Sequence, residues 1–263
     1  MSLTGKTIAA SYKDVLQIDN SNNGMTTSTK AIKSGDGTSS CVKISDDQLA
    51  IQPINDDTTT LLNVATNSGT ALLVVDSTNS TVKALGNHLN TQYAYFGTNY
   101  VDFSTLSANT HYAIPFSASN GGASATNDVD FGTGTDPSTT FTTANTDTQY
   151  ASQLVPCLWF VPEDITIDSV TSIEGADAAT GDTTRMHLYS FTLNSGATGA
   201  LTSGTLLAHN SDTTNAGNEQ LYKSSWTIDS ANVTGGKVLM CFFRSDSVNS
   251  DYSLNITVKY HLT

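Results

Sequence analysis

Paired acidic residues are the first candidates for chemistry in this sequence. A glycosidase, for example, needs two carboxylates held on rigid strands beside the scissile bond. The acid pairs here are Asp46/Asp47, Asp56/Asp57 and Asp128/Asp130. Each pair lies among Ser, Thr, Asn or Gly residues, where an aspartate typically hydrogen bonds to its own backbone in a turn. We therefore predict turns at these positions and no catalytic residue.

The histidines and glycines give no stronger indication of an enzyme. The five histidines are scattered, and no two have the short spacing of paired metal ligands. Gly132-Thr133-Gly134 lacks the lysine and the following helix of a phosphate loop. We predict no cofactor and no metal site. The alternative is a calcium site at Asn127–Asp130 or Asp177–Asp182, since oxygen ligands gather there without the spacing of an EF-hand.

A long polar passage, residues 117–148, is the first candidate for ligand binding. Phe131 and Phe141 are its only apolar anchors, so we expect mostly surface loop, which can vary without disturbing the packing of a domain. Small polar residues of this kind suit hydrogen bonds to sugar hydroxyls. The candidate binding residues in the passage are Asp128, Asp130 and Asp136.

Aromatic residues just before this passage are the second candidate. Tyr95, Phe96, Tyr100 and Phe103 lie in a less regular stretch, where they either stack on sugar rings or close one end of a domain. Trp159 and Trp226 lie among apolar strand residues, and we expect both in a core.

Composition narrows the class of partner. The net charge is −13, so the chain should repel nucleic acid and anionic membrane surfaces. Only 38% of residues are hydrophobic, and no apolar run approaches the ~18 residues of a membrane span or forms the core of a signal peptide. We expect synthesis in a cytoplasm.

The spacings of Cys41, Cys157 and Cys241 match neither a disulfide framework nor a zinc site, and we expect buried thiols.

Residues 35–92 consist of very short apolar runs separated by polar turns. The runs predict strands of about four to six residues at every ten to twelve positions: Val42–Ile44, Leu49–Ile51, Leu61–Val64, Leu72–Val75 and Val82–Leu85. Such strands bury too little apolar area to offset the entropy of ordering one chain. We expect a stalk in which identical chains wind together, with Val64, Leu73 and Val75 at the seam.

The remainder of the chain, residues 93–263, predicts an all-β head domain. Strands are expected at Gln153–Val161, Ile165–Ile173, Thr184–Leu193, Thr205–Ala208, Gln220–Ile228, Lys237–Phe243 and Tyr252–Tyr260. Several alternate apolar and polar residues, as strands with one buried face do. About eight strands in ~150 residues suit a two-sheet sandwich of the jelly-roll type.

Several phrases resemble those of fibre and spike-like virion proteins of tailed, notably marine, bacteriophages. They are SYKDVLQIDNSNNG, GDGTSS, SDDQLAIQPINDDTTT, VVDSTNSTVKALG and FFRSDSVNSDYSLNITVKYHL. The resemblance implies a homotrimeric virion appendage. Residues 1–34 would anchor it to other virion proteins, and the C-terminal head would be exposed.

The resemblance leaves the place of such an appendage open. It would be a tail fibre that binds a host-surface glycan, or a head fibre that decorates the capsid. A glycan-degrading tailspike is disfavoured, because the chain has no room for the long β-helix that such enzymes usually need.

Overall fold

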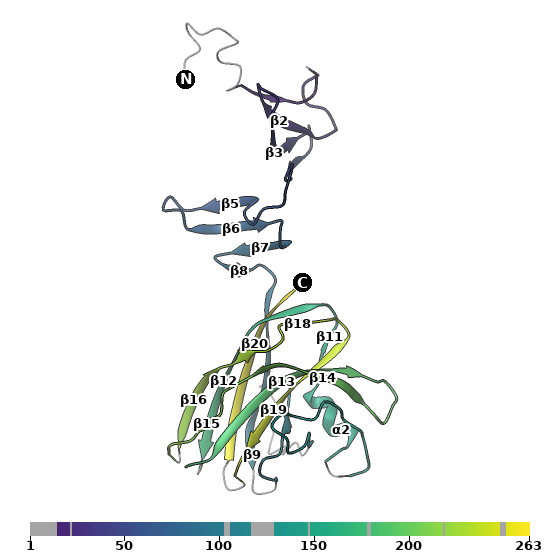
Figure 1. Cartoon of the computed structure of the whole chain (residues 1–263), viewed down its shortest axis with the longest axis vertical. Helices are drawn as coiled ribbons and strands as arrows, with labels where there is room; N and C mark the ends of the chain where they lie inside the picture. The colour runs from purple at the N-terminus through teal and green to yellow at the C-terminus, as the bar shows by residue number, and fades with distance from the viewer. Residues whose placement is uncertain are drawn as a thin grey trace. The chain divides into compact units, whose positions relative to one another are not determined.

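The computed structural model describes residues 15–21, 23–102, 106–116, 129–146, 148–177, 180–217, 219–247 and 251–263, with residues 99–102 as backbone alone. The protein is nearly all β, as predicted, and the described part contains several antiparallel sheets and one four-residue α-helix. The chain divides into two compact units, residues 1–89 and 90–263. Figure 1 labels their elements. In the described residues, no helix is long and apolar enough to cross a membrane.

The first unit contains two four-stranded antiparallel sheets of consecutive hairpins (Figure 1). In both sheets, each strand pairs with its neighbours in sequence. One sheet has the order β1 (Leu16–Ile18), β2 (Lys30–Ser34), β3 (Ser39–Ile44), β4 (Leu49–Ile51), and the other β5 (Leu62–Ala65), β6 (Ala71–Asp76), β7 (Thr81–Ala84), β8 (Asn87–His88). All five predicted short strands are present. The boundary that we drew after residue 34 falls inside the first sheet.

Turn chemistry explains why these hairpins form. The β7–β8 turn has positive φ at both Leu85 (49°) and Gly86 (82°), which is the conformation of a tight type I′ hairpin. In the β6–β7 turn, Asp76 accepts hydrogen bonds from the backbone and side chain of Asn79. These bonds lower the pKa of Asp76. Its role is that of a turn residue, which is the role predicted for the acid pairs.

The second unit contains two antiparallel sheets packed face to face (Figure 1). The larger sheet has the order β10 (Tyr112–Ile114), β19 (Lys237–Ser245), β13 (Thr183–Leu193), β14 (Leu201–His209), β17 (Thr227–Ile228), with β11 (Trp159–Val161) on β19 and β15 (Thr213–Thr214) on β13. The smaller has the order β16 (Gln220–Ser225), β12 (Ile165–Asp177), β20 (Asp251–Leu262), β9 (Thr91–Asp102), with β18 (Asn232–Val233) on β12.

The core between these sheets follows the alternation that the sequence predicts. Met186 and Leu188 of β13 pack against Ile256 and Val258 of β20 in one buried cluster. Both tryptophans are buried in this cluster, as expected. The indole N–H of Trp226 donates a hydrogen bond of 2.9 Å to Ser172 Oγ. Cys157 and Cys241 are buried thiols, as expected, whereas Cys41 in the first unit is only half-buried.

The described part of residues 117–148 is irregular and mostly exposed, as predicted for a surface loop, and its two phenylalanine anchors are buried. Residues 129–146 lie against the outer face of the larger sheet, where Val129, Phe131 and Phe141 are buried with Phe191 and Phe242 in a second core. The Phe131 ring centroid lies 4.6 Å from that of Phe242 and 4.9 Å from that of Phe141. The larger sheet beneath them buries these residues. Because they are isolated in a polar passage, no periodic pattern in the sequence indicates which sheet they contact. We call residues 129–146 the covering segment.

A glycine on β14 lets the covering segment approach the sheet. A Cβ at Gly204 would lie 2.7 Å from both Thr139 Cα and the ring of Phe191. The Gly204 N–H donates a hydrogen bond of 2.8 Å to Thr139 O. Any larger residue would therefore have to displace the segment from the strand.

The strand predicted at Gln153–Val161 is correct only at its end. Residues 151–157 form helix α2 (Ala151–Leu154) and a 3₁₀ turn η3 (Val155–Cys157), and only Trp159–Val161 is a strand, β11. Pro156 explains the difference, because its ring fixes φ and it has no N–H for a sheet ladder. Leu154 and Cys157 of this short helical stretch complete the second core.

One carboxyl group is buried between the sheets of the second unit. Glu174 of β12 is 1% exposed, and Thr184 Oγ1 of β13 lies 3.0 Å from both of its carboxyl oxygens. Burial raises the pKa of Glu174 to about 7. Folded protein thus keeps this proton up to about pH 7, whereas the unfolded chain releases it near the ordinary value of 4.5.

The stability of the second unit should therefore fall as pH rises from about 4.5 to 7. In that window the folded state binds more protons than the unfolded state, so ionisation favours unfolding, by about 3 kcal/mol for a shift of this size. Glu174→Gln should remove this part of the pH dependence, and Glu163→Gln, at an exposed acid, should not. Urea unfolding followed by tryptophan fluorescence at a series of pH values measures it. Equal pH profiles for the two variants would contradict the assignment.

Candidate functional site

One face of the second sheet in unit 1 is apolar across three strands. Val64 lies directly opposite Leu73, which lies opposite Ala84, and Leu62 lies opposite Val75, which lies opposite Val82. Directly opposed residues of antiparallel strands share a face. The three predicted seam residues, Val64, Leu73 and Val75, therefore lie together. We call these six residues the apolar face: Leu62, Val64, Leu73, Val75, Val82 and Ala84.

No described residue of its own unit covers the apolar face. Val64 is 45% exposed and Val82 is 37% exposed, and the other large side chains of the face are only half-buried. In the described part of unit 1, residues 15–21 and 23–89, no apolar residue reaches the burial of a core residue. The hydrophobic effect therefore contributes little to ordering one copy, against about 1–2 kcal/mol of backbone entropy per residue.

The predicted aromatic site is described only in part. Tyr95 lies on β9 at the edge of the smaller sheet and is 45% exposed, and Tyr93 on the same side of the strand is also exposed. The side chains of Tyr100 and Phe103 lie outside the described residues. Ala94 and Phe96 alternate with the two tyrosines and point into the core, so Phe96 is fully buried and cannot stack on a sugar. This alternation places the two tyrosine rings on the outer face of the strand.

The three predicted aspartates have different environments. Asp128 lies outside the described residues. Asp130 is half-buried and accepts a hydrogen bond from Gly132 N, as a turn aspartate does. Asp136 is exposed, and its Oδ1 lies 3.3 Å from Nε2 of the fully buried His187. The structure therefore brings only Asp136 to another chemically active side chain.

A row of three histidines lies on the covered side of the larger sheet. The ring centroids of His111 and His187 are 5.0 Å apart, and those of His187 and His209 are 6.4 Å apart. Burial lowers the pKa of His111, and it lowers that of His187 to about 3, with nearby positive charges adding to the effect. Both rings are therefore neutral at pH 7, and the Asp136 contact is with a neutral imidazole.

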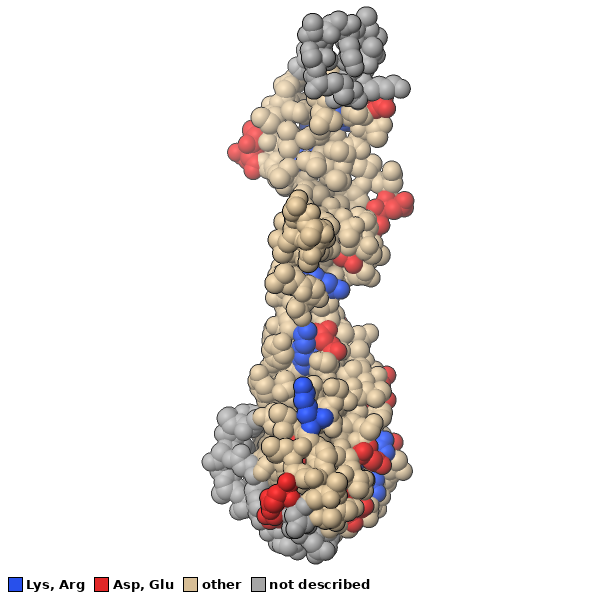
Figure 2. Space-filling model, turned by 90° about the vertical axis from the view of Figure 1, so that its left-hand side faces the viewer, with Lys and Arg blue, Asp and Glu red and all other residues tan. Residues whose placement is uncertain are grey.

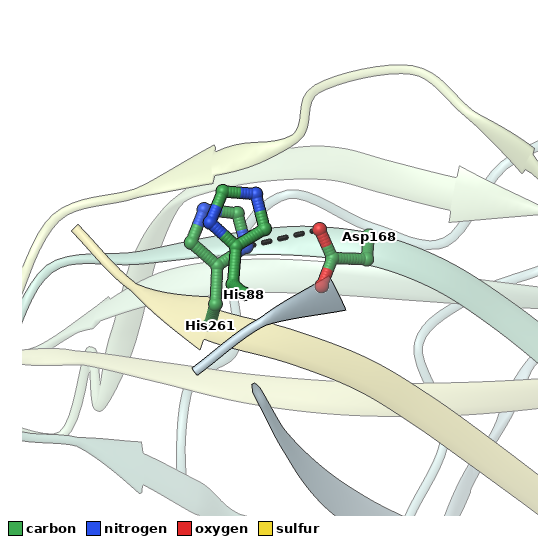
Figure 3. Close-up of side chains that lie close together, drawn as sticks. All are labelled: His88, Asp168 and His261. Carbon is green, nitrogen blue, oxygen red and sulfur yellow. Dashed lines mark hydrogen bonds and ion pairs between the residues drawn. The ribbon is translucent and has the colours of Figure 1, made fainter. Parts of the chain in front are cut away.

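A second histidine–aspartate pair connects two strands of the smaller sheet at a β-bulge. The pairing of β12 with β20 shifts between Ile167 and Ser169, which leaves Asp168 as the extra residue of a bulge. Its Oδ1 lies 2.9 Å from Nδ1 of His261 on β20 (Figure 3). The pair thus bridges the two strands where the regular ladder is interrupted.

The stretch considered for calcium does not converge on one point. A hydrogen bond with Asp177 raises the pKa of Glu219, so these two carboxyl groups face each other. Asp182 Oδ2 instead lies 3.5 Å from the hydroxyl of Tyr252. Asp177, Glu219 and Asp251 border a pocket of about 420 Å³ beside β16, β12 and β20. The other calcium candidate, Asn127–Asp130, lies partly outside the described residues.

A pocket at one end of the larger sheet contains the two arginines of the sequence. Arg185 on β13 lies directly opposite Arg244 on β19. The pocket measures about 220 Å³, and its lining residues are Asn109, Thr183, Thr184, Arg185, Asp212, Arg244 and Asp246. We call it the arginine pocket. Sequence reasoning missed it, because the two residues are far apart in the chain and neither belongs to a motif.

Neither the protein families nor the curated proteins with which the sequence was compared contain a match to this chain.

Proposed function

We propose that this chain is a structural protein of a bacteriophage virion, a homotrimeric fibre. Residues 1–34 attach it to other virion proteins, the rest of the first unit forms an intertwined stalk, and the second unit, a jelly-roll-like sandwich, binds a glycan on the host surface. The observation that carries the proposal is the apolar face, which the described residues of its unit leave uncovered and which is part of no buried core there. A head fibre that decorates the capsid would use the same assembly at a different place on the particle.

Self-association would stabilise the first unit. Additional copies would cover the apolar face and supply the apolar area that one copy lacks. The number three comes from the resemblance to fibre proteins, and a parallel arrangement would bring the same face of each chain to one axis. The local hairpins allow such winding, because each sheet is complete within its own chain.

The surface supports glycan binding better than binding to a charged polymer. On the face drawn in Figure 2, uncharged residues cover most of both units, and Asp, Glu, Lys and Arg side chains lie among them. Hydroxyl and amide groups suit hydrogen bonds to sugars, and three copies would raise a weak single-site affinity through avidity.

The mass of the full chain in solution tests the assembly. We expect light scattering at micromolar concentration to give about 83 kDa, three times the 27.7 kDa of one chain. A mass of one chain would exclude the stalk model. Antibody labelling of intact particles then distinguishes attachment to the tail from attachment to the capsid, and adsorption of purified trimer to host cells tests the receptor role.

A further inference from the structure

The arginine pocket brings together two like charges that the fold could have kept apart. The sequence has only two arginines, and they occupy directly opposed positions on adjacent antiparallel strands. Side chains at such positions start about 5 Å apart at Cβ, and like charges there are destabilising. An arrangement that costs stability in the free protein is typical of a binding site that a ligand completes.

The protein only partly compensates this charge. Arg185 Nη1 lies 3.5 Å from Asp212 Oδ1, and the Asp212 side chain is 58% exposed, so that ion pair is weak. Arg244 Nη2 donates a hydrogen bond of 2.7 Å to a neutral acceptor, Asn109 Oδ1. Among the side chains that the structure describes, no carboxylate forms an ion pair with Arg244, and the Nε–H groups of both arginines are buried without an acceptor.

The rest of the pocket is polar and well positioned. Asn109 adopts a positive φ of 60°, which asparagine tolerates, and its N–H donates a hydrogen bond of 2.7 Å to Ser245 O on β19. Asp246 Oδ1 accepts a hydrogen bond of 2.7 Å from Thr183 N. The pocket thus offers two guanidinium groups beside an amide and two carboxylates, all fixed to the ends of strands or to a tight turn.

We infer that the arginine pocket binds the carboxylate of an acidic sugar residue. The planar guanidinium fork matches a carboxylate in two parallel hydrogen bonds. Asp212 and Asp246 accept hydrogen bonds from sugar hydroxyls, and the same two aspartates disfavour a doubly charged sulfate or phosphate. A volume of about 220 Å³ is below the ~300–1,000 Å³ of pockets for drug-sized ligands, so it admits one sugar residue. That a sugar carries the carboxylate rests on the proposed glycan-binding function, whereas the anion site does not.

The test is a titration of the full chain, followed by nuclear magnetic resonance or calorimetry, with four probes: methyl glucuronoside, methyl glucoside, acetate and sulfate. We expect the glucuronoside to bind at least about ten times more tightly than each of the other three. Equal affinity for the glucuronoside and the glucoside would overturn the inference. Equal or tighter binding of acetate or sulfate would also overturn it, since the pocket would then recognise a bare anion.

Variants assign the binding to the pocket. Arg244→Gln should weaken glucuronoside binding about 10- to 100-fold, the range for a lost hydrogen bond to a charged group. Lys223→Gln removes the same charge from the exposed outer face of β16 and should leave the affinity unchanged. Unchanged affinity in Arg244→Gln would contradict the assignment.

Two further measurements keep the test independent of folding and of the fibre proposal. Arg244→Gln removes one of two opposed charges, so it should not lower the urea concentration at which half of the second unit is unfolded. If Arg244→Gln nevertheless unfolds, Arg244→Lys keeps the charge without the planar fork and should still bind more weakly. Because binding is measured in solution, a monomeric mass would disprove the fibre and failed adsorption would disprove its receptor role, and either result would leave the pocket standing. If the glucuronoside did not bind, the pocket inference would be disproved and the fibre proposal would stand.

Discussion

Val64→Asp is expected to convert the trimer into monomers of 27.7 kDa. The variant places one carboxylate per chain in the middle of the apolar face, opposite Leu73. Self-association would bury three such charges near one axis without partners, at a cost of several kcal/mol for each ion. Light scattering across a concentration series measures the loss.

The matched control is Asn63→Asp. It adds the same charge one position earlier on β5, where the alternation of the strand directs the side chain to the opposite face, and the trimer should persist. Leu73→Asp should behave like Val64→Asp. A trimer that survives both apolar-face substitutions would show that the chains associate through another surface, and a control that also dissociates would implicate net charge alone.

Phe131→Ala is expected to lower the free energy of unfolding of the second unit by about 3–5 kcal/mol, the range for truncating a buried phenylalanine. Phe131 is 1% exposed and packs against Phe141, Phe191 and Phe242. A loss of this size is a large part of the ~5–15 kcal/mol by which a typical domain is stable. Urea unfolding followed by tryptophan fluorescence reports on this unit alone, because both tryptophans lie in it.

Phe160→Ala is the control for this experiment. Its side chain is 57% exposed on β11, so the same truncation should change the free energy of unfolding by less than ~1 kcal/mol. The comparison separates two accounts of the covering segment. If Phe131 did not anchor the segment to the sheet, Phe131→Ala would be as mild as the control. A mild result would therefore disprove the second core.

The faces of the strands were predictable from the sequence. Alternation places Met186 and Leu188 on one face of β13 and Ile256 on the apolar face of β20, and the structure packs these residues together in the core between the sheets. The short strands of the first unit were predictable for a similar reason, since local turn residues both end them and join them. These features depend on neighbours a few positions apart, which is the range over which a sequence pattern acts.

The second core and the buried acid needed the tertiary structure. Phe131 and Phe141 are isolated in a polar passage, so no periodicity marks them, and their burial depends on the outer face of a sheet made from other parts of the chain. Likewise, Glu174 occupies a strand position that alternation directs inward, and only the facing Thr184 explains how a carboxyl group is tolerated there.

The arginine pocket marks the limit of what this sequence could determine. Apolar alternation fixes which face of a strand is buried, but the choice of pairing partner and register depends on contacts between distant segments. Arg185 and Arg244 become neighbours only because β13 pairs with β19 in one register. A shift of two residues would keep the same faces buried and separate the two charges. The sequence by itself therefore determined the strands and their faces, and tertiary pairing alone decided which polar residues meet.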